Sequence, residues 1–266
     1  MTLIPSQLED TQSRKDRREV PLQSVGVKGV ILPFQIKVKD NGHQTVLATV
    51  DLFANLPHYF KGTHMSRFIE ILEEWRNRPV SDPEIRKILT QTRTLLEAET
   101  AHISIKFKYF IEKQAPVSGL TGILGYDSTF IGDMSDDGMI SKLGVSVPVT
   151  TVCPCSQAIS EIGAHNQRAT IRARVCFTPG RFIWIEDLVR LLEKQGSMDI
   201  FPLLKREDEK YVTEHAFRNP KFVEDVVRDC VLELRQDERI KWFSVECEAE
   251  ESIHQHSAFA CEEESR

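Results

Sequence analysis

Long hydrophobic runs are absent from this 266-residue chain. A membrane-spanning helix needs about 20 consecutive apolar residues, and no stretch approaches that length, so we expect no membrane association. The segment Met1–Arg18 is polar and charged, without the apolar run or the small-residue cleavage site of a secretory signal. We therefore predict a cytoplasmic protein in which residues 1–20 form a poorly ordered arm.

Excess positive charge is absent too. The formal net charge is −6 at pH 7, which argues against binding of bulk nucleic acid, because that needs clustered Lys and Arg. A small anionic ligand in a local basic pocket is compatible with this charge. The six cysteines are expected to be reduced, because nothing indicates an oxidising compartment. Four of them follow apolar patterns or lie in the C-terminal tail and are interpreted as structural: Cys176, Cys230, Cys247 and Cys261.

The apolar pattern predicts a similar order of elements twice. Alternation predicts strands over residues 30–38, 45–52, 103–111 and 121–131, and then over 140–152, 169–177 and 240–248. Helical spacing predicts helices over residues 66–75, 81–96, 184–193, 203–217 and 220–235. Strands joined by hairpins, with helices grouped between them, favour an α+β fold with antiparallel sheets. A seam at Asp133–Gly138 predicts two units, 21–135 and 136–260, the second carrying most of the site.

The strongest chemical signal is the pair Cys153 and Cys155 around Pro154, with His165 a little later in the chain. In an extended segment, side chains two residues apart point to opposite faces, so one thiol can face a pocket. The spacing is too short for an ordinary C-x-x-C zinc knuckle, which favours a single thiolate ligand. Two incidental loop cysteines fit the spacing equally. His165 could be a ligand, a general acid or base, or a hydrogen-bonding loop residue.

Two acidic segments have a simple and a functional interpretation. The charged run around Glu207 is typical of a solvated helix face. Helical spacing nevertheless places Glu207 beside Leu203 and Tyr211, where an inward carboxylate would need a metal or a cation. Glu224 lies in a predicted first helical turn, where the helix dipole already favours acids. Its alternative role is to face the N–H groups of a ligand.

Two histidine segments are also ambiguous. His254 and His256 follow the last predicted strand, and in an extended chain both rings would project to the same face. Such pairs occur in metal sites and in tails alike. The segment Gly62–Arg67 opens a helix whose N-terminus could bind an anion, although capping by Thr63 or Ser66 is the simpler interpretation.

Taken together, the chain resembles the type IB GTP cyclohydrolase family. The matching segments run in order from about residue 25 to residue 260, and their joint occurrence is highly specific: Gly62–Phe68, Pro148–Ser156, Gly163–Arg168, Leu204–Lys210, Asn219–Asp225 and Glu251–His254. The resemblance implies a tunnelling fold, with two ββααββ-type units per chain that assemble into β-barrels. It also implies a homo-oligomer, a homotetramer, with sites at the subunit interfaces.

The resemblance further implies an enzyme that hydrolyses GTP with water to formate and 7,8-dihydroneopterin triphosphate, the first step of folate biosynthesis. A divalent metal ion, which can be manganese, iron or zinc, would lower the pKa of a bound water and deliver hydroxide to the purine. The implied metal ligands are Cys153, His165, Glu207 and His254. Such a mixed sulfur, nitrogen and oxygen set suits a borderline metal.

Further roles follow from the same resemblance. Cys153 and His165 are implied catalytic residues, and Cys155 would be a second catalytic thiol or a supporting residue. Glu224 would anchor the guanine N–H edge. His64, Arg67 and Arg168 are candidates for proton transfer or triphosphate contact. Two alternatives stay open: another tunnelling-fold enzyme, such as the NADPH-dependent nitrile reductase of queuosine synthesis, and a non-enzymatic metal-binding protein. The reductase would need neither Glu207 nor the histidine-rich tail.

Overall fold

The computed structural model describes residue 12, residues 14–178 and residues 180–266. Its strands are β1 (Leu22–Lys37), β2 (His43–Leu56), β3 (Ala101–Gln114), β4 (Thr121–Ser135), β5 (Gly138–Val152), β6 (Asn166–Phe177), β7 (Met198–Asp199), β8 (Ile240–Glu250) and β9 (Ser257–Ser265). Its helices are α1 (Met65–Trp75), α2 (Asp82–Leu96), α3 (Pro154–Ile159), α4 (Ile185–Glu193), α5 (Arg206–Arg218) and α6 (Val223–Gln236).

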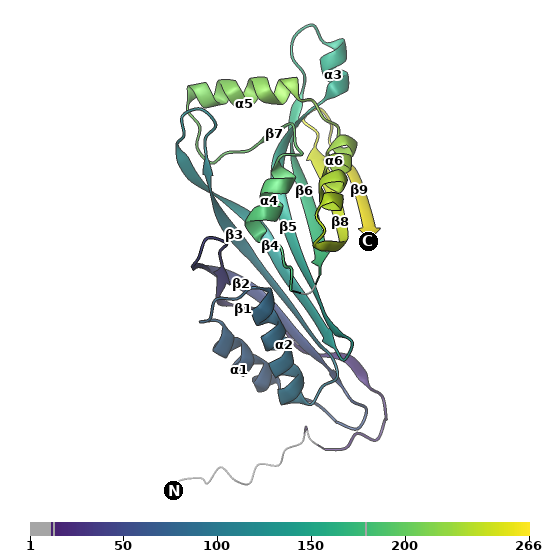
Figure 1. Cartoon of the computed structure of the whole chain (residues 1–266). Helices are drawn as coiled ribbons and strands as arrows, with labels where there is room; N and C mark the ends of the chain where they lie inside the picture. Colours follow the sequence, from purple (N-terminus) through teal and green to yellow (C-terminus); the bar gives the residue numbers. More distant parts are fainter. Residues whose placement is uncertain (1–11, 13, 179) are drawn as a thin grey trace.

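The strands form one antiparallel sheet in the order β1-β2-β3-β4-β5-β6-β8-β9, with β7 paired to β5 (Figure 1). Helices α1, α2, α4 and α6 pack on the sheet through one hydrophobic cluster, which extends from Phe34 in β1 to Phe243 in β8. The opposite, helix-free face carries charged side chains, among them Asp51, Lys106, Asp127, Arg172 and Glu246. This arrangement confirms the predicted α+β class with an antiparallel sheet.

Helix α2 begins as its sequence predicts. Ser81 precedes it in extended conformation, and Pro83 occupies the first turn, where a missing N–H costs nothing. The Glu84 carboxylate accepts hydrogen bonds from the Ser81 backbone N–H at 3.1 Å and from its hydroxyl at 2.8 Å. This capping box satisfies groups that the helix itself cannot pair.

Strand β1 is longer than the alternation predicted, since it begins at Leu22 rather than at Val30. Register shifts between Leu22 and Val25, and again between Val27 and Val30, interrupt the alternating pattern there. Gly26 lies in this stretch, and a Cβ at that position would come within 2.1 Å of the backbone oxygen of Leu52. Because of this irregular pairing, the first part of β1 lacks the regular alternation of apolar and polar residues that predicts a strand.

The predicted conformations of Cys155 and of the segment with Cys261 are wrong. Cys155 does not lie in extended chain, because α3 begins at Pro154 and Cys153 is its N-cap. The segment with Cys261 is not a tail but strand β9, which pairs with β8 from Trp242 to Glu250. The alternation of β9 was missed because the consecutive residues Glu262, Glu263 and Glu264 place charged side chains on both faces of the strand.

The predicted N-terminal arm is only partly described. Residues 1–11 and 13 lie outside the described residues. Further along, Lys15 forms a bridge with Phe60, and the Arg14 carbonyl accepts a hydrogen bond from Lys61 N at 3.0 Å. From Arg14 to Asp16 the chain is therefore paired rather than free. Within the described ranges, none of the helices combines the length and the apolar character needed to cross a membrane.

Candidate functional site

A cavity of about 300 Å³ lies where β5 ends, β6 begins, α6 begins and the loop before β9 passes. Four segments that are far apart in the sequence meet there. Its polar lining residues are Cys153, His165, Gln167, Lys221, Glu224, Glu251, His254 and His256. The structure therefore brings together four of the predicted site residues: Cys153, His165, Glu224 and His254.

Backbone contacts fix Cys153 next to His165. The Cys153 N–H donates to the His165 carbonyl at 3.1 Å. Ser156 links the same two residues, because its N–H donates to Cys153 Sγ at 3.4 Å and its hydroxyl accepts from His165 N at 3.3 Å. Helix α3 thus turns the thiol into the cavity and ties the His165 loop to it.

The imidazole of His165 faces two side chains through its Nδ1 atom. Gln167 Oε1 lies 3.0 Å from Nδ1, within hydrogen-bond distance, and Glu251 Oε2 lies at 3.6 Å. An Nδ1–H that donates to an oxygen leaves the lone pair on Nε2, which is the atom free to bind a ligand. His165 therefore has the support that metal-binding histidines usually receive.

Glu224 is in the first turn of α6, one residue before the capping Asp225. Lys221 N donates to the Val152 carbonyl at 3.0 Å, which holds the start of α6 against the end of β5. Because Asp225 accepts the hydrogen bond from Phe222 N at 3.1 Å, the helix is capped without Glu224. Its carboxylate is exposed and lines the cavity.

The two histidines of the last loop lie close together. The rings of His254 and His256 stack with centroids 5.0 Å apart and planes at 12°. The loop is a turn rather than the extended chain that was predicted, since the His254 N–H donates to the Glu251 carbonyl at 3.3 Å. Both rings line the cavity, so the geometry does not single out one of them as the ligand.

The prediction that Glu207 lies on the inward face of its helix is wrong, because the inward carboxylate belongs to the next residue, Asp208. Leu203 and Tyr211 are 43% and 42% exposed, and Glu207 is exposed with them. Asp208 is the buried carboxylate, and it accepts hydrogen bonds from the backbone N–H and the hydroxyl of Ser118 at 2.9 Å and 2.6 Å. The N-terminal end of α5 is therefore fixed to the β3–β4 hairpin.

Glu207 is also remote from the cavity of its own chain. The C-terminal end of α5 lies beside α3, because Gln157 Nε2 donates to the Phe217 carbonyl at 2.6 Å. Glu207 lies ten residues before Phe217, which corresponds to roughly 15 Å along a helix axis. One chain alone does not place Glu207 with Cys153.

The other predicted residues lie outside the cavity as well. Cys155 is exposed on α3 and does not line the cavity. Arg168 is exposed on β6 and alternates with the buried Gln167, so it points to the helix-free face. His64 and Arg67 lie at the start of α1, whereas α3 is at the opposite end of the molecule (Figure 1).

Buried cysteines elsewhere confirm the structural interpretation for two thiols. Cys230 and Cys247 are fully buried in the core, and burial raises the pKa of the Cys247 thiol to about 12. Such a thiol stays protonated at neutral pH and is a poor nucleophile or ligand. Cys176 is half-buried, and Cys261 is exposed on β9, so the structural interpretation does not hold for Cys261.

The cavity fits a divalent metal by its donor chemistry. A thiol, three imidazoles and two carboxylates line it, which is a set that zinc, iron and manganese sites draw on. Across the part of the chain that the structure describes, however, no three His, Cys, Asp or Glu side chains are grouped closely enough to hold an ion.

Gln167 and Glu251 were not predicted as site residues. Gln167 had a detectable signal, because it is the polar member of an alternating row that continues through Ala169, Ile171, Ala173 and Val175. A buried amide in an apolar row needs a partner. Glu251 had no comparable signal, since acidic residues are frequent in turns.

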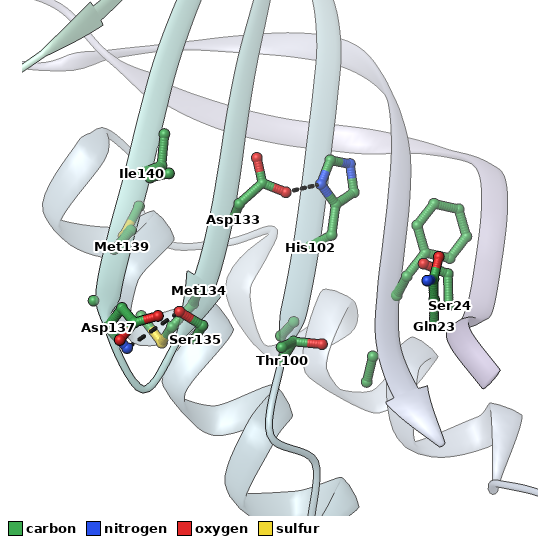
Figure 2. A pocket seen from close by; sticks show the side chains of 14 residues that line it. Gln23, Ser24, Thr100, His102, Asp133, Met134, Ser135, Asp137, Met139 and Ile140 are labelled. Carbon is green, nitrogen blue, oxygen red and sulfur yellow. Dashed lines mark hydrogen bonds and ion pairs between the residues drawn. The ribbon is translucent and has the colours of Figure 1, made fainter. Parts of the chain in front are cut away.

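A second cavity, of about 440 Å³, lies at the other end of the sheet. Figure 2 shows His102 and Asp133 facing each other across neighbouring strands, with His102 Nδ1 2.6 Å from Asp133 Oδ1. His102 also stacks on Phe53 at 5.9 Å. Among the described residues that line this cavity there is no Lys or Arg.

Comparison with known proteins shows the family of this chain. The family model for type I GTP cyclohydrolase FolE2 matches residues 8–260. The chain is 49% identical to the GTP cyclohydrolase FolE2 of Magnetococcus marinus, over 95% of this chain and 94% of that protein. It is 50% identical to the GTP cyclohydrolase FolE2 of Syntrophobacter fumaroxidans, over 97% of this chain and 99% of that protein.

Solved structures resemble it in fold alone. The uricase of Arthrobacter globiformis superimposes with a TM-score of 0.55 at 8% identity, covering 92% of this chain and 94% of that chain. The uricase of Bacillus fastidious gives a TM-score of 0.56 at 6% identity, over 91% and 92%. These neighbours confirm the predicted tunnelling fold. Because the family model covers most of the chain and the relatives are about half identical to it, the chain belongs to the type I GTP cyclohydrolase FolE2 family.

Proposed function

We propose that this protein hydrolyses GTP to formate and 7,8-dihydroneopterin triphosphate, the first step of folate biosynthesis. The observation that supports this best is the convergence of Cys153, His165, Glu224 and His254 on one cavity. Membership of the FolE2 family gives the substrate, and the cavity supplies the residue types that the reaction needs.

The metal would be held by Cys153, His165 and one histidine of the last loop. When bound, it supplies a water of lowered pKa as the nucleophile for the purine carbon. Manganese, iron and zinc all suit this donor set, and the chain does not distinguish among them. His165 arrives already oriented, because its Nδ1 faces Gln167 at 3.0 Å.

Glu224 would hold the guanine base. A carboxylate accepts two N–H bonds side by side, which matches the N–H edge of guanine. Two exposed aromatic side chains line the same cavity, Phe222 at 40% and Phe259 at 57% exposure. Such rings provide flat apolar surfaces against which a purine can pack.

Proton transfer would fall to whichever of His254 and His256 does not bind the metal. Cys155 as a second catalytic thiol stays a prediction, because it is exposed on α3, outside the cavity. His64, Arg67 and Arg168 likewise stay predictions for triphosphate contact.

Assembly would complete the site. Strands β1 and β9 are the edges of the sheet, and pairing these edges between copies would close a β-barrel and remove the exposed backbone groups. We assign Glu207 to the cavity of a second copy, because it is exposed and remote from its own. A homotetramer with shared sites, built from units 21–135 and 136–260, is the corresponding proposal. The cytoplasmic location stays a prediction.

Product analysis tests the reaction. Purified protein with GTP, Mn²⁺ and no nicotinamide should release formate and a pterin that fluoresces after oxidation. A reductase of the tunnelling-fold class would instead consume NADPH with a nitrile substrate. The proposal is contradicted if no pterin forms from GTP with manganese, iron or zinc.

Subunit mixing tests the shared site. Cys153→Ser and Glu207→Ala should each be inactive alone. If Glu207 acts on the neighbouring cavity, a mixed assembly contains some sites with both native residues, and activity returns on mixing. No recovery in a verified mixed assembly would show that Cys153 and Glu207 act within one chain.

A further inference from the structure

We propose that Gln167 is the positioning residue for His165: its side-chain oxygen holds the imidazole in the tautomer whose Nε2 lone pair faces the cavity. The inference deepens the proposed function and rests on it. It concerns one contact, His165 Nδ1 to Gln167 Oε1 at 3.0 Å.

The location of Gln167 is unusual for a glutamine. Gln167 is 8% exposed and belongs to the row of β6 that faces the helices. The next residues of that row, Ala169, Ile171, Ala173 and Val175, are at most 1% exposed. Burying an amide without a partner costs about 1–3 kcal/mol. A polar residue at this place therefore needs a use, and His165 is the partner that the structure supplies.

The direction of the hydrogen bond follows from the atoms. An amide oxygen accepts and cannot donate, so Nδ1 must carry the proton. Neutral imidazole has one N–H, and Nε2 then carries the lone pair. Fixing this tautomer before a ligand arrives removes a cost of binding, which is the usual role of the group behind a metal-binding histidine.

Glu251 is the competing partner for the same N–H. Its Oε2 lies 3.6 Å from His165 Nδ1, outside hydrogen-bond distance, whereas Gln167 Oε1 is within it. The supports also differ: Gln167 lies on β6, opposite Thr151 in the β5–β6 register, while Glu251 begins a turn. A side chain on a paired strand holds its geometry better than one on a loop. Gln167 is thus the better orienting group.

The test measures Co²⁺ binding to the metal-free protein by competition with a chromophoric chelator, together with the thiolate-to-Co²⁺ absorption band. Gln167→Met keeps the shape and removes the oxygen, and we expect roughly 10–100-fold weaker binding and an altered band. Gln167→Glu restores an acceptor and should bind at least as tightly as the native protein. Gln44→Leu is the matched control, because Gln44 bonds the Phe110 backbone in the first half of the sheet.

The outcomes separate the inference from the proposed function. If the native protein shows no Cys153-dependent Co²⁺ band, the metal site is wrong and the inference fails with it. If the native protein binds and Gln167→Met binds equally well, only the inference fails. Thermal unfolding should shift no more for Gln167→Met than for Gln44→Leu once each is compared with native protein. Should Gln167→Met fail to fold, weaker binding by Gln167→Glu would also contradict the proposal.

Discussion

Each half of the molecule has a corner in which a strand ends against the start of a helix, and the two corners differ in what their carboxylates bind. In the first corner, β1 ends against the start of α2, and Lys37 N donates to the Val80 carbonyl at 3.0 Å. In the second corner, β5 ends against the start of α6, and Lys221 N donates to the Val152 carbonyl at 3.0 Å. In both, the residue just before the helix N-cap is hydrogen-bonded to the strand end.

The corners differ in how they use their carboxylates. In the first, Glu84 caps the helix and also binds Lys37 Nζ at 2.8 Å, so it has no capacity for a ligand. In the second, Asp225 caps the helix, and Glu224 is left to face the cavity. A carboxylate is therefore free to contact a ligand in the corner where a different residue caps the helix.

The largest expected effect is the difference in kcat/KM between a variant of the cavity thiol, Cys153, and a variant of an exposed thiol, Cys261. Cys153→Ser replaces the cavity thiol and should lower kcat/KM on the order of 10³-fold or more, because a ligand or nucleophile is lost. Cys261→Ser changes an exposed thiol on β9 that does not line the cavity, and it should leave kcat/KM unchanged. The measurement is pterin formation from GTP. Equal activities for the two variants would remove Cys153 from the site.

Substitution of Glu224 should lower activity and leave stability unchanged, whereas substitution of Glu84 should lower stability and leave activity unchanged. Glu224→Gln should lower kcat/KM by about 10²-fold, because the guanine edge loses a charged acceptor, while the free energy of unfolding stays unchanged. Glu84→Gln should leave kcat/KM unchanged and cost about 1 kcal/mol of unfolding free energy through the weakened cap. Steady-state kinetics and urea unfolding of both variants check this difference. Similar profiles would mean that the corners do not differ as described.

Much of this fold was predictable from local pattern, and the first corner shows why. Ser81, Pro83 and Glu84 specify a helix start by themselves, and the predicted and observed helices agree there. The family and the tunnelling fold, inferred from motifs, are confirmed by the relatives and the structural neighbours. Alternation predicted most strands, whereas the predicted β1 was too short because of its register shifts, and β9 was missed.

The site was predictable in part. Cys153, His165, Glu224 and His254 meet as expected, although no local rule joins residues about 100 positions apart. Asp208, rather than Glu207, faces inward because the β3–β4 hairpin offers it N–H donors, and that contact spans 90 residues of sequence. Tertiary partners of this kind override helical spacing and cannot be read from a window of sequence.

Substitution of Asp208 should have a smaller effect on kcat/KM. It anchors the α5 end that carries Glu207, and it accepts hydrogen bonds from Ser118 and from Lys205 N at 2.8 Å. Burial alone would raise the pKa of Asp208, but these bonds hold it well below its usual range. Asp208→Asn should misplace Glu207 and lower kcat/KM about 10-fold.

The matched control for this anchor is Asp237→Asn, which removes the charge of a carboxylate that also accepts a backbone N–H, from Arg239 at 3.0 Å, and that lies outside α5 and the cavity. Its effect on kcat/KM should be smaller than that of Asp208→Asn. Equal losses would show that general loosening, rather than the placement of Glu207, lowers the activity.

The smallest effect is a pH dependence confined to the first corner. Burial alone would raise the pKa of Glu84, but hydrogen bonds from Lys37 and Ser81 outweigh it and hold the pKa below its usual range. Because the folded-state pKa lies below the unfolded value of about 4.3, the ion pair stabilises the protein above that pH. The contribution is lost as the pH falls through the folded-state pKa.

Urea unfolding of native protein and of Glu84→Gln, at about pH 6 and about pH 3, isolates this contribution. The difference in unfolding free energy between the two proteins should shrink at the lower pH, since protonated Glu84 resembles glutamine. Glu224→Gln, whose side chain makes no ion pair within the described residues, should show no comparable change relative to native protein. A constant difference for Glu84→Gln would mean that the first corner gains nothing from its charge, and that capping alone distinguishes it from the second.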